Sequence, residues 1–381
     1  MQELSEIRQH IDQIDQDITR LFLERMEVSQ EVAAYKRKHG AAVYDHARER
    51  KNIAAASARV PSELASYAAT LQAILMEASR DVQYRSLQYE HDLTARVQSA
   101  LNKAPLAFPS DAHVACQGVE GAYQQLAVER LFKRPDIQYF HTFEDVFSAV
   151  EDGLTDYGVL PIENSTAGSV NRVYDLMMRK SFFIVRSCRL KIDHNLLVKP
   201  GTKLEDVRVI YSHQQAIDQC AGFLSTMDRC RVEACENTAV AAQMVSESSD
   251  PHVAALASRA CSSIYGLEVA RADVQDSQSN YTRFACIARN LTIFPGADRT
   301  SLMAVVRHEP GALYNVLARF YALGINLIKL ESRPIPNRDF EFMFYFDVEC
   351  PVAAPEFSAL LNSLADTCED VRYLGSYTEV V

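Results

Sequence analysis

The chain lacks the features that mark several broad classes of protein. No block of Lys or Arg stands out in its 381 residues, and 39 basic against 50 acidic residues give a formal net charge of -11. A nucleic-acid partner or an anionic membrane surface is therefore not expected. No apolar run approaches the span of a bilayer, and the first residues, with Glu3, Glu6 and Arg8, are not a basic and then apolar leader. These absences predict a cytoplasmic protein.

The cysteines also lack a recognisable arrangement. None of the nine belongs to a Cys-x-x-Cys pair, and most have apolar neighbours, so we expect buried free thiols in a reducing compartment. With 48% hydrophobic residues the chain can build real cores, and its length suits a soluble enzyme of two or three domains.

The N-terminal part carries a helical pattern. Apolar residues three and four apart from Leu4 to Tyr35 predict a helix over about Ser5 to Lys38. At 1.5 Å per residue this helix would be roughly 50 Å long, too long for about ninety residues to cover, so we expect it to intertwine with a second copy. Two further helices are predicted, over about 45 to 59 and from Pro61 to the mid-nineties.

Arg25 interrupts the apolar stripe of this first helix. Such a cation is either buried and paired or the floor of an anion site. Arg8 and Lys36 flank the same stripe, so three cations lie on or beside a face that should be apolar. We therefore favour a carboxylate-binding pocket.

The next predicted helix carries Asp45, Arg48 and Glu49 on one face, which alone would suit a solvated face of salt bridges. Residues 1 to 90, however, resemble the helical, intertwined-dimer chorismate mutases, and residues 1–95 are assigned to such a domain. Positions that carry functional residues in that family are occupied here by Arg8, Arg25, Lys36, Asp45, Arg48, Glu49, Ser79 and Gln83.

The resemblance implies a role for each of these residues. Arginines would clamp the two carboxylates of chorismate, with Arg8 supplied by the partner subunit and Arg25 by the same chain. Lys36 and Gln83 would donate hydrogen bonds to the ether oxygen, where negative charge grows as the C–O bond breaks. Glu49 and Asp45 would hold the ring hydroxyl and the bound conformer, supported by Arg48 and Ser79.

The central part alternates short apolar runs with helical patterns, a βαβ rhythm. Strands are predicted at 112–117, 157–161, 183–198, 207–211 and 253–257. Three joints are rich in glycine or polar residues: Gly118 to Tyr123, Pro161 to Val170, and Tyr211 to Gln215. The free N–H groups of a helix start attract anions, although each joint alone is a weak signal.

A polar segment at 276–284 leads into the apolar run 285–288, which is typical of a strand. This places Thr282 and Arg283 at a strand mouth, where a hydroxyl beside a guanidinium can handle an anionic substrate and its departing oxygen.

Thr282, Arg283 and Phe284 match the Thr-Arg-Phe signature of prephenate dehydratases, and with the three joints the resemblance covers about 110 to 290. It implies two α/β lobes like those of periplasmic solute-binding proteins, with the site in a cleft. Thr282 would help hydroxide leave, Arg283 and helix N-termini would face the carboxylates of prephenate, and Phe284 would shape the site by packing. Positioning or relay roles are implied for Glu163, Asn164, Ser165, Thr166 and Ser212.

The last part, 299–381, follows a βαββαβ pattern, the ferredoxin-like order. We predict strands at 301–308, 325–333, 340–348 and 371–378 and helices at 311–323 and 354–366.

This part resembles ACT domains of the phenylalanine-binding kind. The matching segments are Gly311, Ala312 and Leu313, and then Glu331, Ser332, Arg333 and Pro334. A turn glycine at 311 and an exposed ion pair between Glu331 and Arg333 would explain the two segments separately. Because both segments occur at the expected places of one βαββαβ unit, we favour amino-acid binding. A glycine-rich helix start would receive the carboxylate of phenylalanine and an apolar interface its ring.

Taken together, the chain resembles the bifunctional chorismate mutase and prephenate dehydratase family of phenylalanine synthesis. The resemblance implies conversion of chorismate to prephenate and then to phenylpyruvate without metal or organic cofactor, feedback inhibition by L-phenylalanine, and a homodimer or higher homo-oligomer. Two other interpretations stay open. The helical part could be a dimerisation module without mutase activity, or the whole chain a non-catalytic sensor with a solute-binding cleft.

Overall fold

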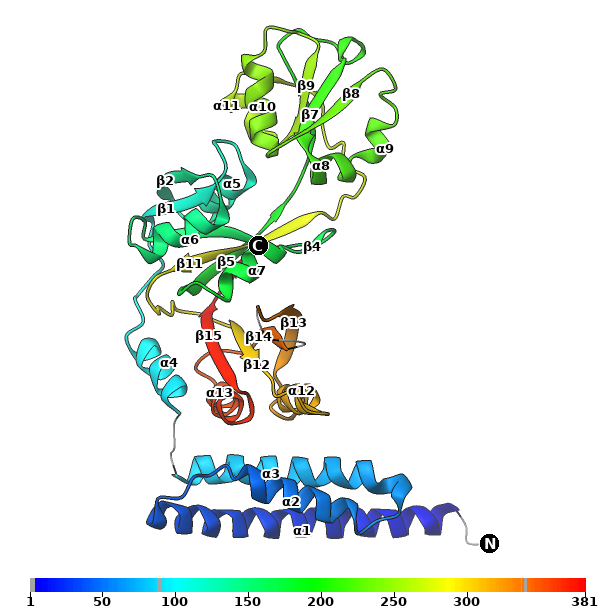
Figure 1. The fold of residues 1–381 in the computed structure, drawn as a ribbon, viewed down its shortest axis with the longest axis vertical. Coiled ribbons are helices and arrows are strands. Elements are labelled where there is room, and N and C mark those ends of the chain that lie inside the picture. The colour runs from blue at the N-terminus through cyan, green and yellow to red at the C-terminus, as the bar shows by residue number, and fades with distance from the viewer. Residues whose placement is uncertain (1–3, 88–90, 337, 339–340) are drawn as a thin grey trace. The chain divides into compact units, whose positions relative to one another are not determined.

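The computed structural model describes residues 4–87, 91–336, 338 and 341–381 (Figure 1). The chain divides into two compact units, one formed by Met1–Val97 with Pro355–Glu369 and the other by Gln98–Ala354 with Asp370–Val381. No helix within the described ranges is long and apolar enough to cross a membrane.

The first unit is built of helices. The helices α1 (Leu4–His39) and α2 (His46–Ser57) both contact α3 (Ala65–Leu87). These bounds confirm the predicted first and second helices. A short 3₁₀ helix, η1 (Ser62–Leu64), precedes α3.

The single third helix predicted to reach the mid-nineties is wrong. The helix α3 ends at Leu87, residues 88–90 lie outside the described part, and α4 (Asp92–Asn102) starts anew. The start of α4 is fixed by Asn362 of α13 (Pro355–Thr367), whose side-chain oxygen accepts from the backbone N–H of His91 at 3.0 Å and from Thr94 Oγ1 at 2.6 Å. Such a contact across 271 positions leaves no local pattern in the sequence.

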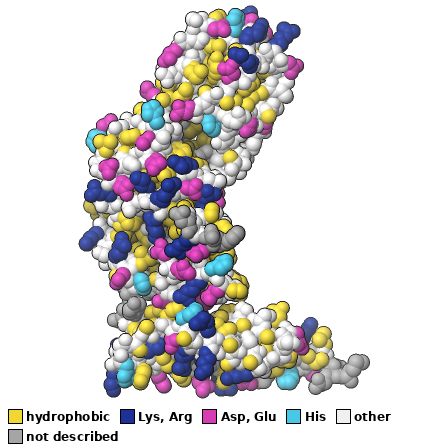
Figure 2. Space-filling view, viewed as in Figure 1, with side chains coloured by type: hydrophobic (Ala, Val, Ile, Leu, Met, Phe, Trp, Pro, Cys, Tyr) yellow, Lys and Arg dark blue, Asp and Glu magenta, His cyan; other side chains and the backbone are white. Residues whose placement is uncertain are grey.

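The apolar stripe of α1 lies largely on the surface of this unit. The side chains Leu4, Ile7, Ile11, Ile14, Ile18 and Leu21 are between 42% and 62% exposed. Figure 2 shows hydrophobic side chains gathered on the surface of the helical unit. The described residues of its own unit leave this face largely uncovered, although most helical stability comes from packing the apolar face.

The second unit contains a seven-stranded sheet with the order β16-β5-β11-β3-β1-β2, from which β4 pairs with β3. Its strands are β1 (Asp111–Gln117), β2 (Arg134–Phe140), β3 (Tyr157–Asn164), β4 (Gly168–Ser169), β5 (Phe183–Lys191), β11 (Tyr281–Ala288) and β16 (Glu379–Val380). Its helices are α5 (Tyr123–Leu131), α6 (Phe143–Glu151) and α7 (Asn171–Met177).

Two apolar cores cover the two faces of this sheet. Ala285 and Ile287 of β11 join the core that contains α6 and α7, whereas Phe284 and Cys286 join the core that contains α5. Successive side chains of a strand point to opposite faces, so this alternation assigns every residue of β11 to a face.

A five-stranded sheet of order β10-β6-β9-β7-β8 forms a second lobe. Its strands are β6 (Asn195–Val198), β7 (Val209–His213), β8 (Arg231–Cys235), β9 (Val253–Ala257) and β10 (Glu268–Arg271). Its helices are η2 (Leu204–Asp206), α8 (Gln214–Gln219), α9 (Ala221–Leu224), α10 (Thr238–Glu247) and α11 (Ala260–Ile264).

One strand prediction in this region is wrong. The run 183–198 is not one strand, because β5 and β6 lie in different sheets and the chain crosses between the lobes at 192–194. It crosses back between β10 and β11. The predicted strands at 112–117, 157–161, 207–211 and 253–257 are confirmed as β1, β3, β7 and β9, with shifted ends in most cases.

The third sheet is antiparallel with the order β13-β14-β12-β15. Its strands are β12 (Arg299–Val305), β13 (Asn326–Pro334), β14 (Phe342–Glu349) and β15 (Asp370–Tyr377), and α12 (Ala312–Ala322) and α13 complete the predicted βαββαβ sequence of elements. Residue 340, the predicted start of one strand, lies outside the described part.

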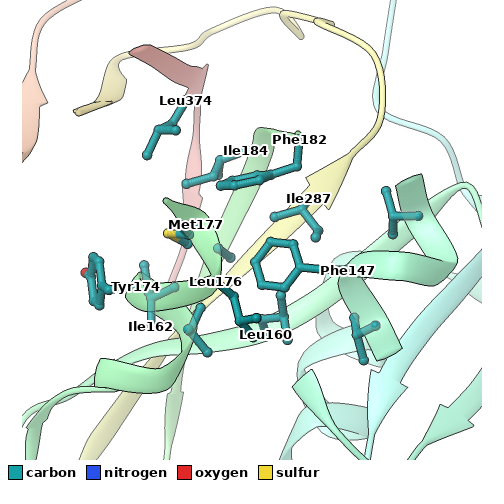
Figure 3. Packing of buried hydrophobic residues seen from close by; sticks show 14 of the residues in the cluster. Phe147, Leu160, Ile162, Tyr174, Leu176, Met177, Phe182, Ile184, Ile287 and Leu374 are labelled. Carbon is teal, nitrogen blue, oxygen red and sulfur yellow. The ribbon is translucent and has the colours of Figure 1, made fainter. Parts of the chain in front are cut away.

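The third sheet shares a core with the seven-stranded sheet. Leu374 of β15 lies beside Ile184 of β5, with Phe182 close by (Figure 3). Arg372 donates to the backbone oxygens of Met178 and Lys180 at 2.8 and 2.9 Å. The last sheet is therefore joined firmly to the first lobe.

Candidate active sites

A cavity of about 800 Å³, here named the N-terminal cavity, lies among α1, α2, α3 and the loop before α2. The predicted mutase residues of this chain, Arg8 excepted, all line it: Arg25, Lys36, Asp45, Arg48, Glu49, Ser79 and Gln83. Arg8 is exposed on α1, 28 positions before Lys36 and thus about 42 Å away along the helix. A cavity in this chain cannot receive Arg8 from the same α1.

Arg25 is held in place by α3. It donates to the backbone oxygen of Leu75 at 2.5 Å and to the hydroxyl of Ser79. Ser29 also donates to Ser79 at 2.9 Å. Burial lowers the pKa of Arg25, although the charge of Glu49 opposes this shift. The guanidinium is thus fixed at the cavity wall, as an anion site requires.

Lys36 projects from the last turn of α1 and donates from Nζ to the backbone oxygen of Val43 at 2.6 Å. Burial lowers its pKa from the ordinary 10.5, and the carboxylates of Asp45 and Glu49 work against that shift. Asp45 itself caps α2 by accepting from the backbone N–H of Arg48 at 3.0 Å. Of the three residues predicted to share a helix face, Asp45, Arg48 and Glu49, the first is therefore the N-cap of α2.

Gln83 is a buried residue of α3 that lines the N-terminal cavity. Its amide oxygen has no hydrogen-bond partner among the described residues. A buried oxygen is costly to leave unpaired, so this atom is available to a hydrogen-bond donor on a ligand.

Sequence reasoning missed Arg80, which also lines this cavity. It is 7% exposed, ion-pairs with both carboxylate oxygens of Glu49, and stacks its guanidinium over the ring of Tyr44 at 5.1 Å from the centroid. The available signal was its position three residues before Gln83, which puts both on one helix face.

A second cavity, the central cavity, has a volume of about 460 Å³ and is lined by both lobes of the second unit. Thr282 and Phe284 of β11 and Asn164 of β3 line it together with the starts of α5 and α10. Among its described lining residues there is no Lys or Arg. An anion in this cavity would therefore depend on helix N-termini and polar side chains.

Thr282 sits in a polar network. The side-chain amide of Asn164 donates to Thr282 Oγ1 at 2.9 Å and to Asn280 Oδ1 at 2.8 Å. Asn280 donates to Gln219 Oε1 at 3.0 Å, and Gln219 donates to Thr166 Oγ1 at 3.0 Å. Because the threonine oxygen accepts from Asn164, its own hydrogen is left to point at a ligand.

The other predicted residues of this region do not line the central cavity. Ser212 is buried and donates to the backbone oxygen of Leu256 at 2.8 Å, and Ser165 donates to that of Ser279 at 2.9 Å. Glu163 pairs with Lys329 of β13 at 3.0 Å. Thr166 donates to Asn164 at 2.7 Å and so acts on the network from outside the cavity.

Arg283 does not face the cleft, contrary to our expectation. The strand β11 begins at Tyr281 rather than at Ala285, so Thr282 and Arg283 lie inside a strand and point to opposite faces. Arg283 is buried and pairs with Asp347 of β14 at 2.7 Å and with Glu379 of β16 at 2.8 Å. These carboxylates, with Tyr377, keep the pKa of Arg283 above its ordinary value despite its burial.

Two aromatic residues of the central cavity were also missed. His194 is buried in the crossing between the lobes, where burial lowers its pKa, and its Nε2 lies 3.0 Å from Gln219 Oε1. Since that oxygen accepts, Nε2 carries the hydrogen. Tyr123 donates to the backbone oxygen of Asp193 at 2.6 Å. In the sequence, only their positions at joints between elements indicated that His194 and Tyr123 belong to a site.

A third cavity, the C-terminal cavity, has a volume of about 360 Å³ and is lined by Ala312 and Leu313 with Phe342 and Phe344. Gly311 starts α12 with a φ of +84°, a conformation that suits glycine. The second predicted segment lies elsewhere, on β13 between Glu331 and Pro334.

Within that β13 segment, Glu331 accepts from Ser169 at 2.5 Å, and Arg333 pairs with Asp175 at 2.8 Å. Ser332 pairs with Phe344 of β14 in the sheet. The two predicted segments are therefore not brought together in one cavity of a single chain.

No cluster of three or more His, Cys, Asp or Glu in the described part could hold a metal ion. All nine cysteines belong to the described ranges and are free. Burial raises the pKa of Cys116 and Cys188 to about 12, which makes these thiols poor nucleophiles.

Two family models match different parts of the chain. The family model for chorismate mutase type II matches residues 7–84, and the model for prephenate dehydratase matches residues 114–292. The chain is 33% identical over 380 residues to the bifunctional chorismate mutase/prephenate dehydratase of Escherichia coli strain K12, covering 97% of this chain and 95% of that protein.

Two further proteins resemble a part of the chain. The arogenate dehydratase/prephenate dehydratase 1, chloroplastic, of Arabidopsis thaliana is 38% identical over 285 residues, covering 70% of this chain and 72% of that protein. The crystal structure of prephenate dehydratase in complex with L-Phe from Arthrobacter aurescens is 25% identical with a TM-score of 0.65, covering 70% of this chain and 90% of that one.

Proposed function

The chain belongs to the family of bifunctional chorismate mutases/prephenate dehydratases, and from this premise we propose which residues perform each reaction. We assign rearrangement of chorismate to the N-terminal cavity, dehydration and decarboxylation of prephenate to the central cavity, and inhibition by L-phenylalanine to the last segment. The corresponding domains are 1–95, 110–290 and 299–381. The observation that carries the assignment is the convergence of Arg25, Lys36 and Gln83 on one cavity from separate turns of α1 and α3.

The mutase reaction is a concerted shift of electrons, so the N-terminal cavity has to supply shape and charge rather than a nucleophile. Arg25 is placed to bind a carboxylate, and Arg8 of a second copy would bind the other. Lys36 and the amide of Gln83 would donate to the ether oxygen as its bond to carbon breaks and negative charge develops. Glu49 would accept from the ring hydroxyl, with Asp45, Arg48 and Ser79 holding the cavity wall.

The dehydratase reaction removes CO₂ and the ring hydroxyl of prephenate together, and the protein has to help hydroxide leave. Thr282 is the group we assign to this step, because it lines the cavity and Asn164 donates to its oxygen, which leaves its own hydrogen for a ligand. Phe284 shapes the wall. The prephenate carboxylates would lie at the starts of α5 and α10, which supply free backbone N–H groups.

In this proposal, the residues outside the central cavity hold in place the strands and loops that form its walls. Ser165 and Thr166 hold the loop after β3, and Ser212 holds β7 against β9. Glu163 of β3 and Arg283 of β11 tie these strands to the last sheet through Lys329 and Asp347, and Arg283 also pairs with Glu379 of β16 within its own sheet. We therefore reassign Arg283 from substrate binding to positioning β11.

L-phenylalanine binding is assigned to the segments at Gly311–Leu313 and Glu331–Pro334. A relative solved in complex with L-Phe supports this assignment. The segments lie apart in one chain, so we propose an ACT-type site completed by a second copy, with the carboxylate at the start of α12. Binding would shift the population of the central cleft between states.

A single time course tests the two catalytic assignments. Purified protein is given chorismate alone, and prephenate and phenylpyruvate are followed for the wild type, Lys36→Ala and Thr282→Ala. We expect phenylpyruvate from the wild type, accumulated prephenate from Thr282→Ala, and unconsumed chorismate with Lys36→Ala.

Two other outcomes would favour the alternative interpretations. Untouched chorismate with active turnover of supplied prephenate would make the helical segment a dimerisation module. Binding of prephenate without turnover of either compound would make the chain a sensor.

A further inference from the structure

The N-terminal cavity contains one cation more than the proposed reaction uses. Arg25, Lys36 and Arg48 are assigned, whereas Arg80 is equally part of the lining and has no role in the proposed reaction. Arg80 is also the most deeply buried of these cations, at 7% exposure. A buried guanidinium inside a binding cavity requires a reason, because burying a charge is unfavourable unless it is paired.

We propose that Arg80 is a positioning residue of the mutase site, which holds the Glu49 carboxylate oriented to accept the ring hydroxyl of the substrate. The inference rests on the proposed assignment of mutase activity to the N-terminal cavity. It adds a residue to that site and gives Glu49 its orienting partner.

The geometry restricts Glu49 from two sides. Arg80 reaches from α3 to Glu49 on α2, and a single guanidinium nitrogen contacts both carboxylate oxygens. The guanidinium is itself fixed by the ring of Tyr44, which precedes α2, at 5.1 Å from the ring centroid. Since the carboxylate keeps further lone pairs, it can still accept a hydrogen bond from a ligand in the cavity.

Charge balance supplies the second reason. A substrate with two carboxylates enters a cavity that already contains Asp45 and Glu49, and like charges repel strongly where water is excluded. Arg80 compensates the charge of Glu49 at contact distance, so Arg25 and Lys36 remain available to the substrate. The Glu49 carboxylate then stays in place as a hydrogen-bond acceptor.

The geometry also argues against a direct role of Arg80 in binding a substrate carboxylate. Its contact with Glu49 is a charge-assisted pair between a buried guanidinium and a partly buried carboxylate, and Tyr44 lies against the guanidinium. Arg80 would have to abandon Glu49 to reach a substrate, which would leave that carboxylate unpaired. A positioning role acts through Glu49, so it has to disappear when Glu49 is removed.

A double-mutant cycle on the full chain tests this dependence. The variants are Arg80→Met, Glu49→Gln and the double variant, with Arg80→Lys as the conservative change. Chorismate consumption gives kcat and KM for each. We expect Arg80→Met to lower kcat at least tenfold with a smaller change in KM, and Arg80→Lys to restore part of that loss. In the Glu49→Gln background, adding Arg80→Met should change kcat/KM less than threefold.

The double variant also guards against a failure to fold, because it leaves no unpaired carboxylate at position 49. Turnover of supplied prephenate checks that each protein is intact. Equal losses from Arg80→Met in both backgrounds, a pure rise in KM, or an unchanged kcat would overturn the inference while leaving the proposed function intact. A wild-type chain that does not consume chorismate would overturn both.

Discussion

Lys36 loses its proton at a lower pH than an ordinary surface lysine, because its pKa is lowered. Burial lowers its pKa from 10.5, and mutase activity in our scheme needs the charged form. Activity should therefore be constant at neutral pH and fall as pH rises through the lowered pKa of Lys36. The profile of kcat/KM for chorismate against pH measures this, and Lys36→Arg should move the alkaline limb to higher pH. An identical limb in both proteins would show that another group titrates.

Thr282 can be tested by a change that preserves its shape. Thr282→Val removes the hydroxyl, and Thr282→Ser retains it. Because donation from a positioned hydroxyl contributes a factor of about 10² to 10⁴, we expect kcat for prephenate to fall by about that factor in the valine variant and far less in the serine variant. Chorismate consumption serves as the internal control. Similar kcat values for both variants would contradict the assignment.

Gly375 matters at the scale of elements, because β15 approaches β5 there without a side chain between them. A Cβ at Gly375 would lie 2.0 Å from the backbone oxygen of Ile184, and its φ is +141°. Gly375→Ala should therefore separate β15 from β5 and destabilise the unit by roughly 2 kcal/mol or more.

The matched control for this change is Gly201→Ala. Gly201 also has a positive φ, +82°, but nothing lies within 4 Å of the Cβ position. Gly201→Ala should introduce only backbone strain, which lowers the free energy of unfolding by about 1 kcal/mol. Thermal unfolding of both variants measures the difference, and equal losses would mean that the contact with Ile184 contributes nothing.

Arg283 joins three strands through buried charges. Arg283→Met leaves Asp347 and Glu379 without this partner, and removing one member of a buried ion pair costs about 3–5 kcal/mol. The control is Arg134→Met, which removes the fully exposed pair with Asp111 and should leave the unfolding midpoint nearly unchanged. Urea unfolding monitors both proteins. Our reassignment of Arg283 fails if the two midpoints shift alike.

Helices and strands that depend on local patterns could be predicted from the sequence more accurately than those that depend on distant residues. The helix α1 and the strand β9 carry strong periodicity or a continuous apolar run, and their bounds agree closely with prediction. Residues 281–283 are polar and were assigned to a loop. They form a strand because Lys191 and Asn164 in neighbouring strands pair with Tyr281 and Thr282, which overrides local preference.

The same distinction applies to the sites. A family motif identified Thr282, but the face to which Arg283 points depended on where β11 begins. Arg80 escaped notice because its partner Glu49 lies 31 positions away, and the spacing of three residues to Gln83 does not reveal that pairing. Residues that act through distant partners are those that pattern reasoning does not find.

For the whole molecule, the exposed stripe of α1 predicts association through that helix. The double change Ile11→Asp and Ile14→Asp places charge in the stripe and should shift the protein towards monomer. Mutase activity should be lost with it, since Arg8 would no longer reach a partner, while prephenate turnover continues. Sedimentation velocity over a range of concentrations reports the change. Gln16→Asp, which adds charge on the side of α1 opposite the stripe, is the control, and a dimer that survives the double change contradicts the proposal.

The position of β16 at the edge of the seven-stranded sheet has a consequence for biosynthesis. Ser187 of β5 pairs with Glu379, across a sequence separation of 192 positions. On the ribosome, this edge of β5 stays uncovered until nearly all of the chain has emerged, long after β1 and β3 can pair and after β11 can cover the other edge of β5. An uncovered edge invites pairing with other chains, so slow translation beyond β11 prolongs the interval in which a nascent protein depends on chaperones.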